Sequence, residues 1–191
     1  MGVAWPYYTL GMKLRRQTSV VLVLLSVLSA LASAQHVANQ KTVQETQARG
    51  YWIDPATGLM WAGKDNGKDV SWRGAIKYCR SLRLAGYSDW RLANMFELQP
   101  LYDSGVESPG TAGPGKGRAD TWHVKGGLFL TGNQWASNLR NDGRSSGYEY
   151  YFDFNEGRSN DDPVGWPYPY HFMRALCVRG TGDPLAGQRQ H

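Results

Sequence analysis

The sequence predicts an α+β domain made of short strands, turns and two helices. Its 191 residues include 23 glycines, 11 tyrosines and 8 tryptophans, and 41% are hydrophobic, a composition typical of a globular chain. Aromatic residues favour strands and glycines favour turns, whereas runs of helix-forming residues are scarce. These observations favour one globular domain and argue against a helix bundle.

The first 34 residues are organised as a secretory signal peptide. Basic residues lie ahead of an apolar run from Val20 to Leu31, and Ala32-Ser33-Ala34 follows it as a small-x-small cleavage site; these are the parts of such a leader. The run is shorter than the roughly 18 apolar residues of a transmembrane helix. Because residues 1–11 do not fit the pattern, we expect translation to start at Met12. We expect a mature protein that begins at Gln35, is soluble and is secreted or periplasmic.

Without the leader the net charge is small. The chain carries 21 basic and 16 acidic residues; residues 1–34 hold three of the basic and none of the acidic ones, so the formal net charge falls from +5 to +2. A surplus of this size creates no domain-wide field. We therefore expect no nucleic-acid partner.

The chain contains two cysteines, Cys79 and Cys177. An even number of cysteines in an exported protein predicts a disulfide. The alternative is a free catalytic or metal-binding thiol, but the sequence has no C-x-x-C spacing and Cys79 has no histidine nearby. We expect the disulfide, which would join the first predicted helix to the last predicted strand.

A polar segment precedes the domain. Residues 35–49 lack clear periodicity and predict a linker. From Gly50 onward, the pattern predicts a strand over 51–53, a turn with proline and glycine over 54–58 and a second strand over 59–61.

Two helices are expected next. Ser71 can cap a helix that reaches residue 84, and its buried stripe recurs at helical spacing: Trp72, Ala75, Ile76, Cys79 and Leu82. Asn94 and Glu97 match a capping box at the start of a second helix. Pro100 should end that helix early or kink it.

One side of the first predicted helix is basic. The row consists of Arg73, Lys77, Arg80 and Arg83, with no acid among them. Such a row is most often a solvated helix face, but this one is also the densest acid-free basic stripe in the chain. It is therefore our candidate for binding an anion.

The second half alternates loops and short strands. Residues 104–118 are rich in glycine and proline and predict a surface loop. Aromatic and polar residues alternate over 148–154, which predicts a half-buried strand, and Gly157 marks the turn after it. Further short strands are expected over residues 128–130, 135–137 and 172–179.

Several of these segments form an ordered series of motifs. They are Gly58-Leu59-Met60-Trp61, Trp72-x-x-Ala75-x-x-Tyr78-Cys79-x-x-Leu82, Gly86-Tyr87-Ser88-Asp89-Trp90-Arg91-Leu92, Gln134-Trp135-Ala136-Ser137 and Cys177-Val178-Arg179-Gly180. The series resembles the Lcl C-terminal domain family, named for a bacterial collagen-like adhesin. The resemblance covers about residues 50–180 and leaves residues 181–191 as a polar tail.

The resemblance implies a C-type-lectin-like fold, in which two helices pack on a twisted, mostly antiparallel sheet with long loops and the terminal strands meet. Formylglycine-generating enzymes have a related fold, which raises an oxidase as the less favoured alternative. Those enzymes hold copper with a pair of reactive cysteines in the C-terminal half, where this chain has Cys177 alone. We therefore expect a binding module rather than an enzyme, with no resident cofactor.

Metal ligands are sparse in the sequence. His123 and His171 lie in no metal-binding spacing, so we expect loop residues and no metal site. Asn141-Asp142-Gly143 and Asn160-Asp161-Asp162 offer oxygen atoms that suit calcium, which related lectins bind. The sugar-binding calcium triplets of those lectins, Glu-Pro-Asn and Gln-Pro-Asp, are absent from the long-loop region, so turns are the simpler interpretation.

The segment Trp166-Pro167-Tyr168-Pro169-Tyr170 suggests a ligand surface. Its prolines prevent a regular strand ladder and stiffen the chain, and stiff exposed rings can stack on sugars or anchor a protein. The alternative is a loop whose rings fold back over the core. The predicted binding surface is the excursion over 155–170, and the predicted ligand-binding set is Trp166, Tyr168, Tyr170, Arg140, Arg144 and Arg158.

These expectations combine into an exported, non-catalytic module that binds a glycan or a surface or envelope protein. The alternative is a structural or assembly component of an envelope or fimbrial system that uses the same fold as a scaffold. Net charge does not distinguish these functions, because residues 133–180 carry five arginines against six acids.

The leader predicts where the mature chain begins. Cleavage after Ala34 should leave Gln35 as the first residue of the exported protein, because small residues flank the cut as signal peptidase requires. Intact-mass analysis of the secreted or periplasmic protein tests this. A mass that still includes residues 12–34 would contradict it.

Overall fold

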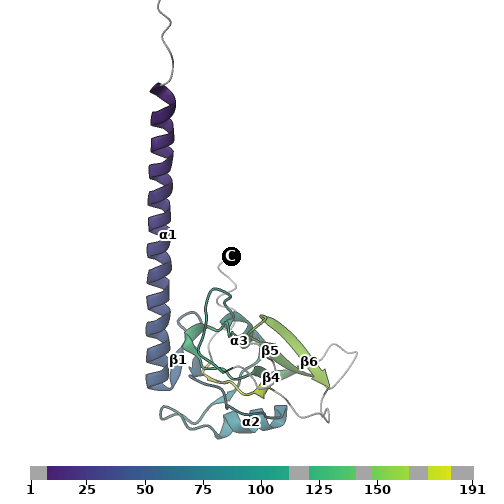
Figure 1. The fold of residues 1–191 in the computed structure, drawn as a ribbon. Coiled ribbons are helices and arrows are strands. Elements are labelled where there is room, and N and C mark those ends of the chain that lie inside the picture. The colour runs from purple at the N-terminus through teal and green to yellow at the C-terminus, as the bar shows by residue number, and fades with distance from the viewer. Residues whose placement is uncertain (1–7, 112–120, 141–147, 164–171, 182–191) are drawn as a thin grey trace, which may run out of the picture. The chain divides into compact units, whose positions relative to one another are not determined.

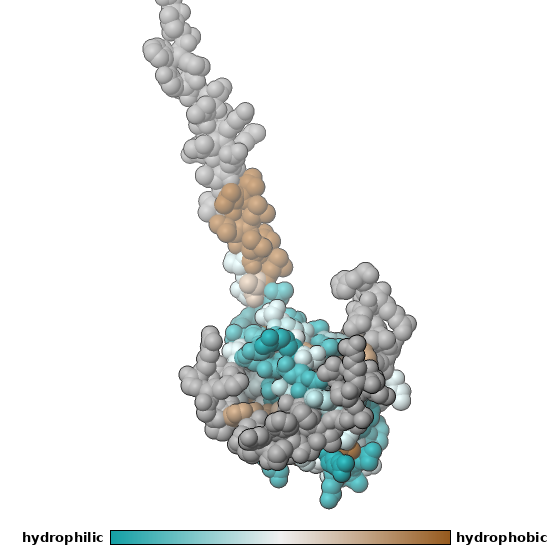
Figure 2. All heavy atoms as spheres, turned by 90° about the vertical axis from the view of Figure 1, so that its right-hand side faces the viewer, coloured by the Kyte–Doolittle hydropathy of each residue, from teal (hydrophilic) through white to brown (hydrophobic). Residues whose placement is uncertain are grey.

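The computed structural model describes residues 8–111, 121–140, 148–163 and 172–181 (Figure 1). The chain divides into two compact units, Met1–Asn39 and Gln40–His191. The first unit holds most of helix α1 (Tyr8–Arg49), and its described side chains between Val20 and Leu31 form an exposed apolar surface (Figure 2). In the part of the chain that the structure describes, no helix has the length and hydropathy to span a membrane.

Residues 35–49 differ from the expected linker, because they are helical to Arg49. The segment contains neither glycine nor proline, so nothing in it breaks a helix. Gly50 ends the helix with a φ of 76°, a left-handed conformation that suits glycine at this position. Near that end Thr46 is buried, and its hydroxyl donates a hydrogen bond of 2.6 Å to the carbonyl of Gly126.

The second unit is an α+β structure with two four-stranded sheets rather than one. In the first sheet the strand order is β1-β2-β8-β3, and every neighbour is antiparallel. The strands are β1 (Tyr51–Ile53), β2 (Met60–Ala62), β3 (Arg91–Leu92) and β8 (Cys177–Arg179). The first two strands and the last therefore lie in one sheet, as the resemblance implies.

The second sheet has the order β6-β5-β4-β7, with β7 parallel to β4. Its strands are β4 (Asn133–Arg140), β5 (Tyr148–Asp153), β6 (Arg158–Pro163) and β7 (Met173–Arg174). Strand β6 forms one edge (Figure 1) and pairs with β5 along its whole length. Part of the predicted binding surface over 155–170 is therefore a regular strand, because residues 158–163 pair with the edge of β5.

Two other strand expectations need correction. Residues 172–179 form two strands, because the chain passes from the second sheet to the first through Ala175 and Leu176, which are fully buried. Residues 128–130 form isolated bridges, Lys64 with Phe129 and Gly110 with Leu130. Each bridge pairs a single residue with a single residue, so residues 128–130 form no strand.

Strand β5 also differs from the half-buried pattern. Phe152 is buried and Tyr150 packs beside it on the first core cluster, as the alternation predicts. On the other face, however, Tyr151 packs on the second cluster with Trp135, and Glu149 is 3% exposed. The strand is covered on both faces because one face packs on the first core cluster and the other on the second.

The helices follow the predicted capping signals. Helix α2 (Trp72–Ser81) begins after Ser71, whose hydroxyl accepts a hydrogen bond from the backbone N–H of Gly74 at 3.2 Å. Helix α3 (Met95–Leu98) has the capping box of Asn94 and Glu97, and the 3-10 turn η1 (Gln99–Leu101) follows it. Pro100 lies in η1 and limits the helix to a single turn. A second 3-10 turn is η2 (Lys125–Gly127).

A disulfide joins helix α2 to strand β8. It links Cys79 to Cys177 across a sequence separation of 98 residues, and both residues are buried. They lie in the core cluster that α2 forms with Trp90 and Leu92. The predicted pairing is confirmed, and it fastens the first sheet to the helix that covers it.

A buried carboxylate connects the two sheets. Asp65, just after β2, is 3% exposed and accepts hydrogen bonds from the Thr131 backbone N–H at 2.6 Å and hydroxyl at 2.8 Å. The Gln134 side-chain amide donates at 3.0 Å and the Gly67 backbone N–H at 2.9 Å. Four donors compensate the lost hydration of this charge.

The network continues from Asp65 into strand β7. The Thr131 hydroxyl accepts a hydrogen bond of 2.7 Å from Arg174 Nε, and Arg174 also forms an ion pair with Asp69. One residue further on, the backbone N–H of Ala175 donates to the Asn66 side chain at 2.8 Å. The loop after β2 therefore holds the point where the chain crosses between sheets.

The disulfide should contribute a large part of the stability of the second unit. Replacing both Cys79 and Cys177 with alanine should lower the free energy of unfolding by about 2–5 kcal/mol, because the unfolded chain would lose the constraint of a long closed loop. Denaturant unfolding of the oxidised protein and the variant measures this difference. A loss well below about 1 kcal/mol would show that packing around α2 suffices without the crosslink.

Candidate functional site

The most distinctive motif, Gly86 to Leu92, is structural. It begins at a tight turn in which Ala85 and Gly86 have φ of 54° and 79°, and Leu84 and Tyr87 exchange backbone hydrogen bonds of 3.2 and 3.0 Å across it. Left-handed conformations at both central residues define the hairpin turn whose twist suits the strands beside it. The turn sets the direction in which the rest of the motif enters the first sheet.

Two residues of the motif hold strand β8. The Asp89 carboxylate accepts hydrogen bonds of 2.8 Å and 3.1 Å from the Arg179 guanidinium. The same guanidinium lies 3.6 Å from the centre of the Tyr87 ring. The hydrogen bond from Arg179 holds the pKa of Asp89 below its ordinary value.

The next residues of the motif hold helix α3. Arg91 donates to both carboxylate oxygens of Glu97, at 2.7 and 2.5 Å. Glu97 is buried and also caps its own helix through the backbone N–H of Asn94 at 2.9 Å. This hydrogen bonding raises the pKa of Arg91, and such a bidentate pair fixes geometry as well as charge. Both ion pairs therefore serve the scaffold, so ligand binding must be sought elsewhere.

The basic row on α2 is present and exposed. Arg73, Lys77 and Arg80 lie on the solvent side of the helix, and no carboxylate among the described residues pairs with them. Arg83 lies beyond the helix, where its guanidinium donates to the carbonyls of Arg80 and Leu82 at 3.3 and 3.0 Å. It therefore caps the C-terminus of the helix, and the free part of the row consists of three cations.

Most of the predicted ligand-binding set lies outside the described residues. These residues are Trp166, Tyr168, Tyr170 and Arg144, and His171 lies outside them as well. Arg140 ends strand β4, but its side chain also lies outside the described part. Arg158 is described: it is exposed at the start of β6, where Glu156 pairs with it and raises its pKa.

Arg158 lines an open groove of about 540 Å³ between η1 and the β5–β6 turn. The groove floor is aromatic, because Tyr102 lies edge-to-face against Phe152 with ring centres 6.3 Å apart. Gly157 has a φ of 68° and packs so closely on Tyr102 that a β-carbon there would collide with the ring. Gln99 and Ser159 add exposed polar groups to the lining.

An exposed aromatic side chain lies close to this groove in the sequence. Phe96 of α3 is 57% exposed and precedes Gln99 by three residues, a spacing that puts two side chains on one helical face. The sequence alone does not single out Phe96, Gln99 and Tyr102, because an isolated aromatic or amide side chain belongs to no motif. We call the five residues Phe96, Gln99, Tyr102, Arg158 and Ser159 the aromatic groove.

The described residues give no support to a metal centre. They contain no group of three histidine, cysteine, aspartate or glutamate side chains that could hold an ion. Asn160–Asp162 lie in strand β6 rather than in a turn, and Asn141–Gly143 lie outside the described residues. His123 Nδ1 lies 2.8 Å from the carbonyl oxygen of Val106, and its ring contacts Tyr102, so its role is structural.

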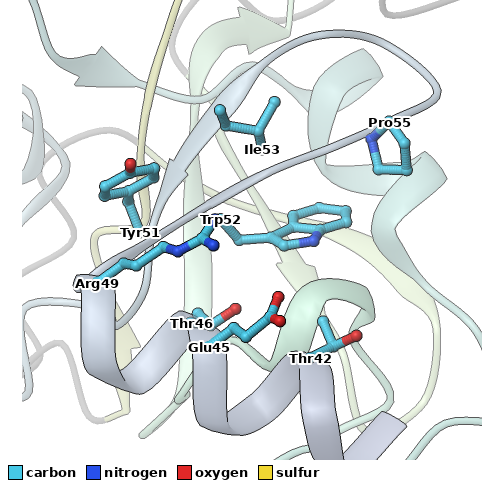
Figure 3. A pocket seen from close by; sticks show the side chains of 8 residues that line it. All are labelled: Thr42, Glu45, Thr46, Arg49, Tyr51, Trp52, Ile53 and Pro55. Carbon is cyan, nitrogen blue, oxygen red and sulfur yellow. The ribbon is translucent and has the colours of Figure 1, made fainter. Parts of the chain in front are cut away.

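A smaller pocket of about 210 Å³ lies between the last turns of α1 and strand β1. Figure 3 shows the Trp52 indole lying across it, with Thr42 and Glu45 of the helix on one side and Ile53 and Pro55 on the other. Gly126 packs against the Trp52 ring so closely that a β-carbon would collide with it. The pocket is below the usual size of a ligand site and marks the seam where the helix end joins the domain.

These features define an α+β scaffold with one disulfide, structural ion pairs and a groove on its surface. Residues 50–179 match the Lcl C-terminal domain, and because that match covers most of the chain, this protein belongs to the Lcl C-terminal domain family. Comparison with curated proteins gave no match. Comparison with solved structures gave none either.

The Asp89–Arg179 pair predicts a pH-dependent stability difference. The pKa of Asp89 is lowered in the folded state, so its contribution is present above the unfolded value of about 3.9 and is lost as the pH falls through the folded value. The melting temperature of Asp89→Asn should lie below that of the natural protein at pH 7, and the two should converge as the pH falls below the folded-state pKa of Asp89.

Ser88→Ala serves as the matched control, because Ser88 is the exposed neighbour of Asp89 in the same motif. Its melting temperature should follow that of the natural protein at every pH. A difference for Asp89→Asn that persists unchanged at the lowest pH would show that the carboxylate charge is not what stabilises the motif.

Proposed function

We propose that this chain is an exported, non-catalytic binding module with a C-type-lectin-like fold, and that its ligand is a surface glycan. Family membership and the α+β scaffold support the fold assignment. So do the position of β8 beside β2 and the disulfide from α2 to β8. The leader and the disulfide support export, since disulfides persist in oxidising compartments.

The observation that carries the binding function is the aromatic groove. It combines a half-buried Tyr102, an exposed Phe96 and the hydrogen-bonding groups of Gln99, Arg158 and Ser159. Sugars offer apolar ring faces together with hydroxyl groups, so aromatic rings beside amide, guanidinium and hydroxyl groups suit them. Arg158 belongs to both the predicted ligand-binding set and the groove.

A binding function agrees with the state of the cysteines. Both are joined in the disulfide, so neither offers a thiolate to the copper ion of a formylglycine-generating oxidase. The polar side chains of the family motif are likewise engaged in structural pairs, Asp89 with Arg179 and Glu97 with Arg91.

A glycan array probed with residues 35–191 tests the proposal. Phe96→Ala and Arg158→Ala should each weaken binding to the glycan found by about 1–3 kcal/mol, as truncation of an interface anchor does, with little change in melting temperature. Phe152→Ala is the control for packing: Phe152 is 2% exposed, so its loss should cost about 3–5 kcal/mol of stability.

The same comparison addresses the predicted aromatic loop. If these rings contact the ligand, Trp166→Ala and Tyr168→Ala should weaken binding with little change in melting temperature, as Phe96→Ala should. If the rings fold over the core, both variants should lose stability, as Phe152→Ala should. If the array shows no binding and the chain retains an envelope protein instead, the ligand is a protein rather than a glycan. Binding unaffected by Phe96→Ala, Arg158→Ala, Trp166→Ala and Tyr168→Ala would refute the groove and the loop as the site.

A further inference from the structure

A second cavity lies away from the aromatic groove, in the region where α1 ends. Its volume is about 550 Å³, within the range of about 300–1,000 Å³ that is usual for small-molecule sites. The wall is formed by the end of α1, the residues after β2, helix α2 with the segment that follows it, and Phe129. It shares no lining residue with the aromatic groove.

The surface of this pocket is largely apolar. Leu82, Leu84 and Phe129 line it and remain partly exposed, and Ala62 contributes to the buried part of the wall. Partly exposed leucine and phenylalanine side chains around one cavity leave apolar area that a ligand can remove from water.

Backbone hydrogen bonds hold the wall in place before any ligand arrives. The Gly63 N–H donates to the Gly50 carbonyl at 2.8 Å, and the Phe129 N–H donates to the Gly63 carbonyl at 2.9 Å. A β-carbon on Gly63 would collide with Gly50, so glycine is needed where these segments meet. A preformed wall lowers the entropic cost of binding.

The polar groups of the pocket favour a negative charge. Its lining contains no carboxylate, whereas Lys64 is exposed at it and pairs with no acid among the described residues. Burial, together with the nearby Asp65, raises the pKa of Tyr78, so the phenol stays protonated and can donate a hydrogen bond. The Asp65 carboxylate itself is occupied by four internal donors.

We propose that this pocket binds a small amphiphile with an apolar body and one anionic head group. The body lies against Leu82, Leu84 and Phe129, and the head group lies at the Lys64 ammonium with the Tyr78 hydroxyl as a second donor. The same chemistry occurs in a free fatty acid and in a single-chain anionic lipid. This proposal stands independently of glycan binding.

Calorimetric titration with a matched set of ten-carbon probes tests the charge preference. Decanoate and decyltrimethylammonium are titrated into residues 35–191 below the concentration at which each forms micelles, and decanol is titrated below its solubility limit. Decanoate should bind most tightly and the cation most weakly. A single-chain phosphatidylglycerol, titrated in the same way, shows whether the pocket accepts the lipid as well as the free acid. Equal affinity for decanoate and decanol, or binding of none of the probes, would overturn the proposal.

Substitutions in the pocket test whether the probes bind there. Lys64→Gln should weaken decanoate binding by about 1.4- to fivefold, the effect of losing one exposed charge pair, and leave decanol binding unchanged. Lys68→Gln is the matched control, since Lys68 is an exposed lysine in the same loop that does not line the pocket. Leu84→Trp should fill the cavity and abolish binding of both probes.

Melting temperatures separate loss of binding from loss of folding. Lys64→Gln should have the same melting temperature as the natural protein, because the exposed lysine makes no ion pair in the described part of the chain. Decanoate affinity that falls equally in Lys64→Gln and Lys68→Gln, or that survives Leu84→Trp in a folded protein, would assign the binding to another surface.

Discussion

The buried carboxylate of Asp65 is the constraint on which the arrangement of the two sheets depends. A buried charge is tolerated only where hydrogen bonds replace its hydration, and the donors around Asp65 come from its own loop and from the start of β4. The Thr131 hydroxyl also accepts a hydrogen bond from Arg174 of β7, which extends the network to that strand. Any other register of β4 against the loop after β2 would take the donors of Thr131 and Gln134 away from the carboxylate, so this network favours one packing of the sheets.

The residues that define the family serve this scaffold. Tyr87 and Asp89 hold Arg179 at the end of β8, and Arg91 holds Glu97 at the start of α3. The Asp89–Arg179 pair connects segments that the disulfide between α2 and β8 also brings together, whereas the Arg91–Glu97 pair joins β3 to α3. A motif occupied by such pairs identifies the fold, whereas function belongs to the surface that the fold presents.

The surface offers two sites of different chemistry. The aromatic groove at α3, η1 and β6 has rings beside hydrogen-bonding groups, whereas the pocket between α1 and α2 is apolar with one cation. They share no lining residue, so each can be altered without touching the other. This separation suits a module that holds a surface ligand at one place and a small amphiphile at another.

The sequence by itself determined the features that depend on neighbours in the chain. Ser71 caps α2, Asn94 and Glu97 form the capping box of α3, and Gly157 turns the β5–β6 hairpin, because each signal acts within a few residues. Tertiary structure alone decided the strand character of residues 158–163, the burial of Glu149 and the aromatic groove around Tyr102. It also decided the Asp65 network, whose bonds to Thr131 span 66 residues and whose Arg174–Asp69 link spans 105. Partners so far apart are chosen by the path of the chain through both sheets, and no local pattern records that path.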